Sequence, residues 1–259
     1  MDLGIEGRSA LVLGASQGLG FACARALTEA GVRVAVNGRN QQRLEQAATA
    51  LGGGCVAVAG DVSSPADRQR IMQQARQHLG PISILVTNAG GPPPGPVEGH
   101  ERDAWLQALE TNMLAALDFT VMALPDMKSD GFGRIVNVTS FTVREPYGNM
   151  GLATGVRAGL TGAMASLAQE VAGLGITVNN ILPGLMDTGA LHRVYAAQAK
   201  REDISQDEAK ARMAASVPMG RLGTADDFGP VCAFLCSRHA GYMTGQNVTV
   251  DGGLVRSLL

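Results

Sequence analysis

Seven short apolar runs, separated by helix-length segments, constrain the fold of this chain more than any other feature. The runs are rich in β-branched residues, and each is bounded by Gly, Asn or Asp. Continuous apolar runs of this length are typical of strands that are buried on both faces of a parallel sheet. They lie at residues 9–15, 32–38, 55–61, 82–90, 134–140, 176–184 and 246–253.

The composition agrees with one large domain that has a substantial core. The chain has 259 residues, of which 46% are hydrophobic and 17% are charged, and this apolar content is too high for a disordered chain. The alternation of strands and helices predicts an α/β fold. We expect a single doubly wound, Rossmann-type domain over residues 1–259, with a seven-stranded parallel sheet and helices on both faces.

Charge and hydropathy narrow the classes of partner. The net charge of −2 gives no electrostatic footprint for nucleic acid or an anionic membrane. No apolar run approaches the ~20 residues that span a bilayer, and the N-terminus has no pattern of a secretory signal. We therefore expect a cytoplasmic protein that acts on a small molecule. Cys232 and Cys236, at i,i+4 spacing, leave a metal site open, but the pattern favours buried cysteines and no metal.

Residues 189–217 differ from the rest of the chain, because they are helical in pattern and highly charged. They follow the sixth apolar run. Ligands of doubly wound folds bind outside the carboxyl ends of the strands, where this segment emerges. We expect a substrate lid, and a solvated pair of surface helices is the alternative.

A glycine-rich turn follows the first apolar run and begins a helix. Gly14, Gly18 and Gly20 allow the backbone to turn sharply and to approach a pyrophosphate, and the helix N-terminus offers free N–H groups. A dinucleotide cofactor is therefore predicted. After the second run stands Arg39, where an acidic residue would hold the ribose 2′-hydroxyl. An arginine pairs with a 2′-phosphate, so NADP(H) is favoured over NAD(H), unless Arg39 is only a surface charge.

Together with these features, several motifs make the chain resemble the short-chain dehydrogenase/reductase family, in particular its 3-oxoacyl-carrier-protein reductase-like members. The resemblance covers nearly the whole length. It rests on GASQGLG at 14–20, GDV at 60–62, TNAG at 87–90, ETNMLAALDFT at 110–120, GRIVNVTS at 133–140, NNILPGLMDT at 179–188, GRLGTADDF at 220–228 and YMTGQNVTVDGG at 242–253.

The resemblance implies roles for the matching residues, and it also implies a homotetramer. Ser140 would bond the substrate carbonyl, or would merely terminate a strand, and Asn112 would hold a water in a proton relay. The cofactor contacts that it implies, with Asn88 alternatively only tying strands together, are Gly14, Ser16, Gln17, Gly18, Leu19, Gly20, Asp61, Val62, Asn88, Gly90, Pro183, Gly184 and Thr188.

The chain departs from the family at the catalytic pair. The family places a tyrosine about thirteen residues after the serine and a lysine four residues later, but Ala153 and Arg157 stand here. The run AGLTG after Arg157 fixes this register. Alanine carries no proton to donate, whereas Arg157 keeps a positive charge that can fork onto ribose hydroxyls. General acid catalysis is worth about 10²–10⁴-fold, so a slower or redirected enzyme is expected.

Tyr147, in the loop after Ser140, is a candidate for the missing proton donor, and a packing or rim role is the alternative. Three functions stay open. The first is a nicotinamide-dependent oxidoreductase for a carbonyl or alcohol with a non-standard site. The second is a redox-silent isomerase, lyase or dehydratase, in which Ser140 and Arg157 bind an oxyanion. The third is a non-catalytic nucleotide-binding subunit.

Overall fold

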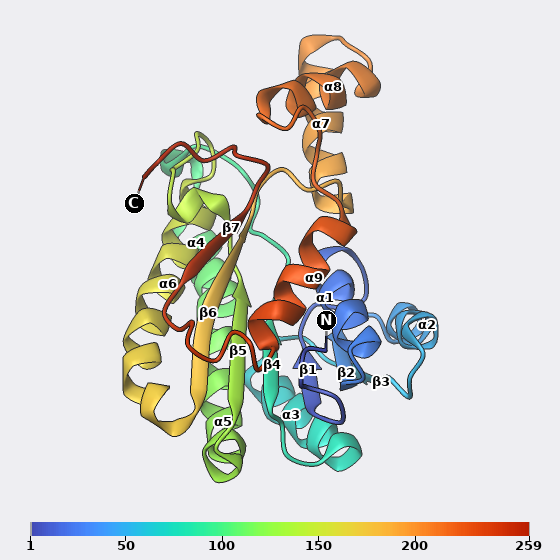
Figure 1. Ribbon diagram of the computed structural model, residues 1–259. Coiled ribbons are helices and arrows are strands. Elements are labelled where there is room, and N and C mark those ends of the chain that lie inside the picture. Colours follow the sequence, from blue (N-terminus) through green and yellow to red (C-terminus); the bar gives the residue numbers. More distant parts are fainter. Residues whose placement is uncertain (1, 259) are drawn as a thin grey trace.

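The computed structural model describes residues 2–258, and its centre is a sheet of seven parallel strands. The spatial order of the strands is β3-β2-β1-β4-β5-β6-β7 (Figure 1). All seven predicted strands are confirmed. They are β1 (Ser9–Val12), β2 (Arg33–Gly38), β3 (Val56–Ala59), β4 (Ile84–Thr87), β5 (Gly133–Val138), β6 (Ile176–Pro183) and β7 (Asn247–Val250).

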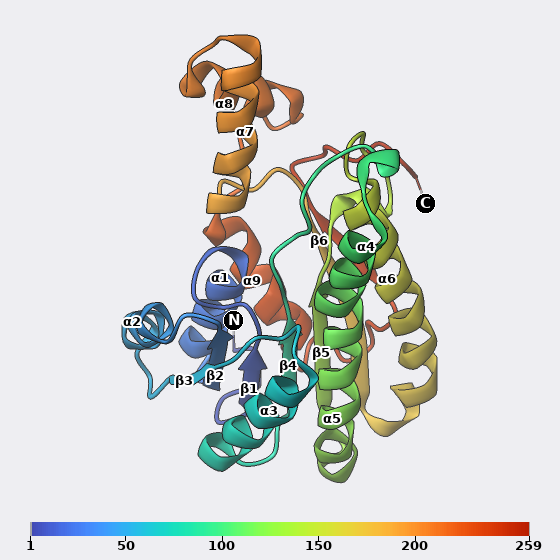
Figure 2. The same cartoon turned by 180° about the vertical axis from the view of Figure 1, so that it is seen from behind.

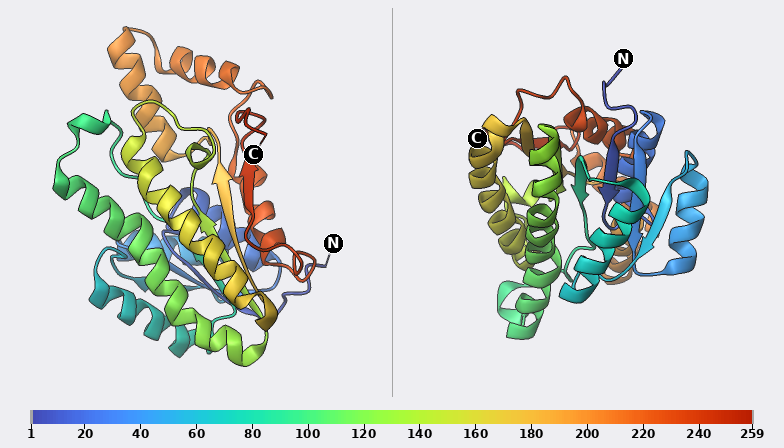
Figure 3. Two further views of the ribbon diagram at one scale, coloured as in Figure 1. Left: turned by 90° about the vertical axis from the view of Figure 1, so that its left-hand side faces the viewer. Right: turned by 90° about the horizontal axis from the view of Figure 1, so that it is seen from below.

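Helices cover both faces of the sheet, as predicted (Figure 3). One face packs against α1 (Gly18–Glu29), α2 (Gln41–Leu51) and α9 (Ala225–Cys236). The other face packs against α3 (Pro65–Leu79), α5 (Ala115–Asp130) and α6 (Gly151–Val171). Successive strand residues point to opposite faces of the sheet. Val12 packs in the core on the first face, and Leu11 and Leu13 pack in the core on the second face. No helix within residues 2–258 is long and apolar enough to cross a bilayer.

A single helical rod crosses the second face, and it contains an irregularity. It begins as α4 (Arg102–Leu109), widens into a π-helix over Glu110–Leu114, and continues as α5. Short 3₁₀ helices lie at Val97–Gly99, Phe141–Val143 and Ala172–Leu174. A π-helical turn inside an α-helix costs regular hydrogen bonding and occurs frequently at functional sites.

Buried polar side chains link four strands. The hydroxyl of Thr87 donates to Oδ1 of Asn137 at 2.7 Å, and Nδ2 of Asn137 donates to Oδ1 of Asn180 at 3.1 Å. Nδ2 of Asn180 then donates to Oδ1 of Asn247 at 2.8 Å. Because each buried amide finds a partner in the next strand, the row satisfies polar groups that burial would otherwise penalise.

The segment after β6 forms two helices, α7 (Gly189–Glu202) and α8 (Gln206–Ser216), that project beyond the body of the sheet (Figures 1 and 2). Their own small core contains Tyr195, Ala199 and Ala209. At the base, the chain leaving the sheet and the chain returning to it are paired: the N–H of Asp187 donates to the carbonyl of Gly223 at 2.7 Å. The segment is therefore an insertion that is closed at its foot.

Candidate cofactor and catalytic site

The glycine-rich turn is built so tightly that its first and third glycines have no room for a side chain. A Cβ on Gly14 would lie 2.6 Å from the carbonyl oxygen of Asn88, and a Cβ on Gly20 would overlap the carbonyl oxygen of Gly14. Gly18 has φ +61°, a conformation that L side chains rarely adopt. Its nearest foreign atom is Cγ2 of Thr188, 4.0 Å from the position of a Cβ. The turn thus faces the loop after β6 across an open interval.

Two of the predicted cofactor residues pack beside that turn. Nδ2 of Asn88, after β4, donates to the carbonyl of Gly14 at 2.9 Å, which ties the two strand ends together. The structure therefore gives Asn88 the strand-tying role, and the same bond fixes the turn. Ser16 lies against Gly38, because a Cβ built on Gly38 would be 3.3 Å from the Cβ of Ser16. Leu19 is partly buried against the first core, and Gly90 is exposed.

Two arginines border the place where the adenosine end of a dinucleotide would lie. Arg39 is exposed after β2, and within residues 2–258 it forms no salt bridge. Nη1 of Arg43, in the first turn of α2, reaches Oε1 of Gln17 at 3.4 Å. Arg43 is a basic residue that sequence reasoning missed. Its position three residues after the helix cap Asn40 was a pattern available for finding it.

Hydrogen bonds to neighbouring residues hold the loop after β3. The carboxylate of Asp61 accepts from the N–H and the hydroxyl of Ser63 at 2.9 and 2.8 Å. The carbonyl of the next residue, Val62, accepts from Nε of the buried Arg68 at 2.5 Å. Asp61 and Val62, which the family resemblance places beside the adenine, therefore lie in a loop that hydrogen bonds from Ser63 and Arg68 hold in place.

The loop that the family resemblance places at the nicotinamide begins at the end of β6. Pro183 is the last strand residue, and the N–H of Gly184 donates to the carbonyl of Val250 at 2.9 Å. A Cβ on Gly184 would lie 2.6 Å from Cβ of Asp251, so the loop fits only around a glycine. Thr188 is the N-cap residue of α7. The sheet and the projecting helices therefore meet at this loop.

Ser140 follows β5 and is 6% exposed. Its Oγ accepts hydrogen bonds from the backbone N–H of Thr142 at 3.2 Å and from the Thr142 hydroxyl at 3.0 Å. With both of these donors on its oxygen, the Ser140 hydroxyl has its own hydrogen left to donate to a ligand. Thr142 was not predicted from the sequence, although a serine followed two residues later by threonine is an ordinary turn pattern.

Asn112 lies in the π-helix and is 8% exposed. Together with Val62, Asn88 and Arg157 it lines a small cavity beneath the carboxyl ends of β1 and β4. The structure thus brings together residues from three separate sequence motifs and from the position of the family's lysine. The π-helical geometry around Asn112 was not predicted, because ETNML continues an ordinary helical pattern.

Arg157 reaches across from α6 towards the loop after β4. Its Nη2 would lie 3.4 Å from a Cβ on Gly91, and among residues 2–258 no carboxylate forms a salt bridge with it. Burial lowers the pKa of Arg157 to about 10, so the guanidinium remains charged at neutral pH. Ala153, one turn earlier, is 2% exposed and offers no acid or base.

Tyr147 lies apart from this group. Its side chain is 66% exposed, and its ring packs edge-on against Phe141 at a centroid distance of 6.1 Å. No hydrogen bond in the part of the chain that the structure describes joins Tyr147 to Ser140 or Arg157. In this conformation Tyr147 is a rim residue that packs against Phe141.

Three of the four cysteines lie in the interior of the domain. Cys23, Cys232 and Cys236 are buried. The hydrogen bond with Cys23 raises the pKa of Cys232, the hydrogen bond with Cys232 raises the pKa of Cys236, and burial raises the pKa of both thiols further. Within residues 2–258, no three His, Cys, Asp or Glu side chains gather as a metal ion would require. These thiols act as small core residues.

Comparison with known proteins agrees with this geometry. The family model described as enoyl-(acyl carrier protein) reductase matches residues 14–255. The NADPH-dependent reductase BacG of Bacillus subtilis is 30% identical over 97% of this chain and 99% of its own. The 3-oxoacyl-[acyl-carrier-protein] reductase FabG of Salmonella typhimurium is 32% identical, with 97% and 99% covered.

A solved structure is equally close in shape. L-sorbose reductase from Gluconobacter frateurii, complexed with NADPH and L-sorbose, superposes with a TM-score of 0.95 at 28% identity and covers 100% of both chains. The expectation of NADP(H) is confirmed at the level of these relatives, since BacG is NADPH-dependent and the sorbose reductase complex contains NADPH. With the family model spanning nearly the whole chain, the protein belongs to the short-chain dehydrogenase/reductase family.

Proposed function

We propose that this protein is an NADPH-dependent reductase of a small carbonyl compound, with an active site in which Ala153 and Arg157 replace the family's tyrosine and lysine. The observation that carries the proposal is the state of Ser140. It is buried just after the carboxyl end of β5, its oxygen already accepts two hydrogen bonds from Thr142, and its hydrogen is left for a ligand.

The residues present fit the cofactor. The turn at Gly14 and Gly20 excludes side chains, and the interval between Gly18 and Thr188 is open to a pyrophosphate. Arg39 would hold the 2′-phosphate, and the guanidinium of Arg157 would donate to the nicotinamide ribose hydroxyls. When bound, NADPH supplies the hydride for the carbonyl carbon.

The protein's own groups act on the carbonyl oxygen. Ser140 donates a hydrogen bond that polarises the carbonyl and stabilises the negative charge that develops on oxygen as hydride arrives. A proton must then complete the alcohol. Residue 153 has none to give, so it comes from water or from Tyr147 after the loop at 144–150 moves inward. Arg157 stays protonated and donates hydrogen bonds only.

The test is a comparison of the natural protein with Ser140→Ala. NADPH binding is measured by its own fluorescence, and turnover by absorbance at 340 nm over a panel of ketones, aldehydes and keto sugars. Turnover should fall about 10²–10³-fold in the variant, because one donor to the developing oxyanion is lost. The affinity for NADPH should stay the same.

The paired variant Ala153→Tyr with Arg157→Lys asks whether the rest of the site is sound. Restoring the acid should raise carbonyl reduction by about 10²–10⁴-fold. Because Ala153 is buried, a melting curve must first show that the tyrosine is accommodated. If the natural protein binds NADPH but oxidises none of it over the whole panel, the reductase proposal fails. Turnover without an absorbance change would then support the redox-silent enzyme, and no turnover of any kind would support the nucleotide-binding subunit.

Two finer expectations accompany this proposal. We infer that α7 and α8 form a substrate lid, since they emerge from the loop that carries Thr188. A homotetramer remains a prediction, and size-exclusion chromatography with light scattering tests it.

A further inference from the structure

Arg68 is the largest of the side chains that the fold buries most completely, and it is 2% exposed. It lies on α3, and it is not part of any motif that the sequence analysis used. Its guanidinium makes four bonds, and they reach two different parts of the cofactor site. Burying a charge is costly unless it is paired and hydrogen-bonded, so this arrangement needs every one of its partners.

One bond goes to the adenine side. Nε of Arg68 donates to the carbonyl oxygen of Val62 at 2.5 Å. Val62 lies in the loop after β3 and lines the cavity that Asn112 and Arg157 also line. The guanidinium therefore fixes the position of this loop relative to α3.

The other bonds go to the rod that contains the π-helix. Nη2 donates to the carbonyl of Glu110 at 3.2 Å and pairs with the carboxylate of the same residue. Nη1 donates to Oδ2 of Asp118 at 2.7 Å. Glu110 is the first residue of the π-helix, and Asn112 follows two residues later. Arg68 thus holds the first residue of the π-helix with hydrogen bonds that are additional to those within the helix.

We propose that Arg68 is a positioning residue that sets the adenine loop at Val62 and the π-helix at Asn112 at a fixed distance, and so keeps the site in shape for NADPH. This inference rests on the proposed cofactor. A single planar fork that bonds both elements transmits a displacement of either to the other. Arg68 would therefore affect NADPH binding indirectly, through the positions of Val62 and Asn112.

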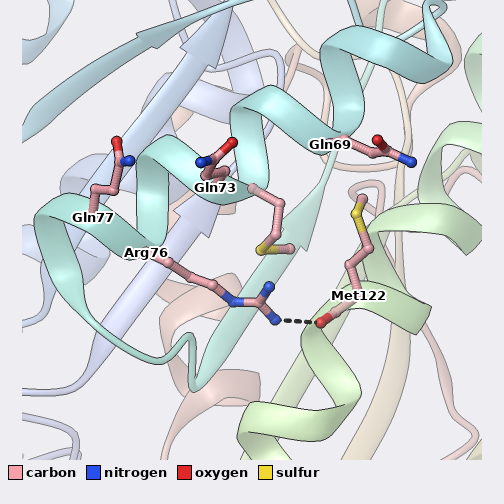
Figure 4. Close-up of a pocket in the computed structure, with 6 residues that line it drawn as sticks. Gln69, Gln73, Arg76, Gln77 and Met122 are labelled. Atoms are coloured by element: carbon pink, nitrogen blue, oxygen red, sulfur yellow. Dashed lines mark hydrogen bonds between the residues drawn. The ribbon is translucent and has the colours of Figure 1, made fainter.

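The same helix offers a matched control. Arg76 lies two turns further along α3 and makes bonds of the same kind with α5 (Figure 4). Its Nε donates to Oδ2 of Asp126 at 2.9 Å, and its Nη2 donates to the carbonyl of Met122 at 2.6 Å. These bonds lie far along the rod from the π-helix. Loss of Arg76 therefore removes an α3–α5 link without touching the cofactor site.

The experiment compares Arg68→Met and Arg76→Met, well below their melting temperatures. The affinities for NADPH and for adenosine 2′,5′-bisphosphate, which carries only the adenosine end, are measured by calorimetry. Arg68→Met should weaken both by about tenfold or more, because small displacements of a binding loop have large effects. Arg76→Met should change neither affinity by more than about twofold, and it should lower the melting temperature less than Arg68→Met does, because the Arg76 side chain is 36% exposed and that of Arg68 only 2%.

Equal losses of affinity in the two variants would show a general stabilising role and overturn the proposal. So would an unchanged affinity for the bisphosphate in Arg68→Met, because the route through Val62 would then be wrong. If Arg68→Met does not fold, Arg68→Lys replaces it: the charge remains but the fork is lost, and an intermediate loss is expected. Failure of the natural protein to bind NADPH at all would contradict the proposed function instead.

Discussion

The glycine-rich turn and the α7–α8 segment border the same edge of the sheet, but they are held in opposite ways. The turn is fixed by backbone groups so close that no Cβ fits at Gly14 or Gly20. The α7–α8 segment has a core of only a few side chains and is tied by surface ion pairs such as Asp187–Lys210. The difference indicates that the glycine-rich turn is rigid, whereas the α7–α8 segment is free to adapt.

The largest expected effect comes from breaking the rigid side with Gly20→Ala. The new Cβ would overlap the carbonyl oxygen of Gly14, and a backbone atom cannot swing aside as a flexible side chain can. We expect a loss of about 3 kcal/mol in the free energy of unfolding, as overpacking gives, measured by denaturant titration. NADPH affinity should fall by roughly 100-fold.

Gly173→Ala is the control for that variant, because a Cβ at Gly173 would meet nothing within 4 Å. A surface change of this kind should alter stability by no more than about 0.5 kcal/mol. Equal effects of the two substitutions would show that the close approach at Gly20 is unimportant.

A medium effect is expected at the edge of the rigid side, where Arg39 is exposed. Arg39→Ala should weaken NADPH binding by about 10–100-fold, the value of a charge-assisted hydrogen bond to phosphate, and leave NADH binding unchanged. The two cofactors, titrated against one preparation, are each other's control. Arg39→Lys should retain most of the preference. An equal loss for both cofactors would assign Arg39 to the adenine ring or to stability.

The smallest effect is expected on the adaptable side, from Asp187→Asn. The carboxylate accepts from Nζ of Lys210 and Nε2 of His192, both at 2.8 Å, and the hydrogen bond from Lys210 is the main cause of its lowered pKa. A partly exposed pair of this kind is worth about 0.5–1 kcal/mol. Amide protection in α7 and α8 should decrease in the variant, while protection in the sheet stays constant.

The pH dependence of that contribution has a definite sign. Because the folded pKa of Asp187 lies below its unfolded value of about 4, its stabilisation is present above that value. It is lost as the pH falls through the folded pKa. Protection in the natural protein and in Asp187→Asn should therefore converge in acid. A difference that persists at the lowest pH would exclude ionisation of Asp187 as its cause.

The sequence predicted the sheet well because buried parallel strands are apolar throughout, and that pattern survives in every one of the seven runs. It predicted the tight glycine-rich turn, because no other residue fits where backbones approach as closely as they do at Gly14 and Gly20. It missed Arg68, since an arginine in RQRIM looks like the solvated face of an amphipathic helix. It also missed the π-helix, because one extra residue per turn leaves no trace in side-chain chemistry. Both depend on contacts between elements distant in sequence.

The pairing at the foot of α7 and α8 has a consequence for how such a protein changes over time. Asp187 and Gly223 join the outgoing and returning chains beside the sheet, and just before Gly223 the N–H of Met219 donates to the carbonyl of Gly252 at 3.2 Å, so the chain on both sides of α7 and α8 is attached to the body of the domain. Residues in the insertion can be lengthened, shortened or exchanged without altering strand register or the cofactor turn. This part of the gene can therefore change as a unit, while the strands of the sheet and the glycine-rich turn stay constant.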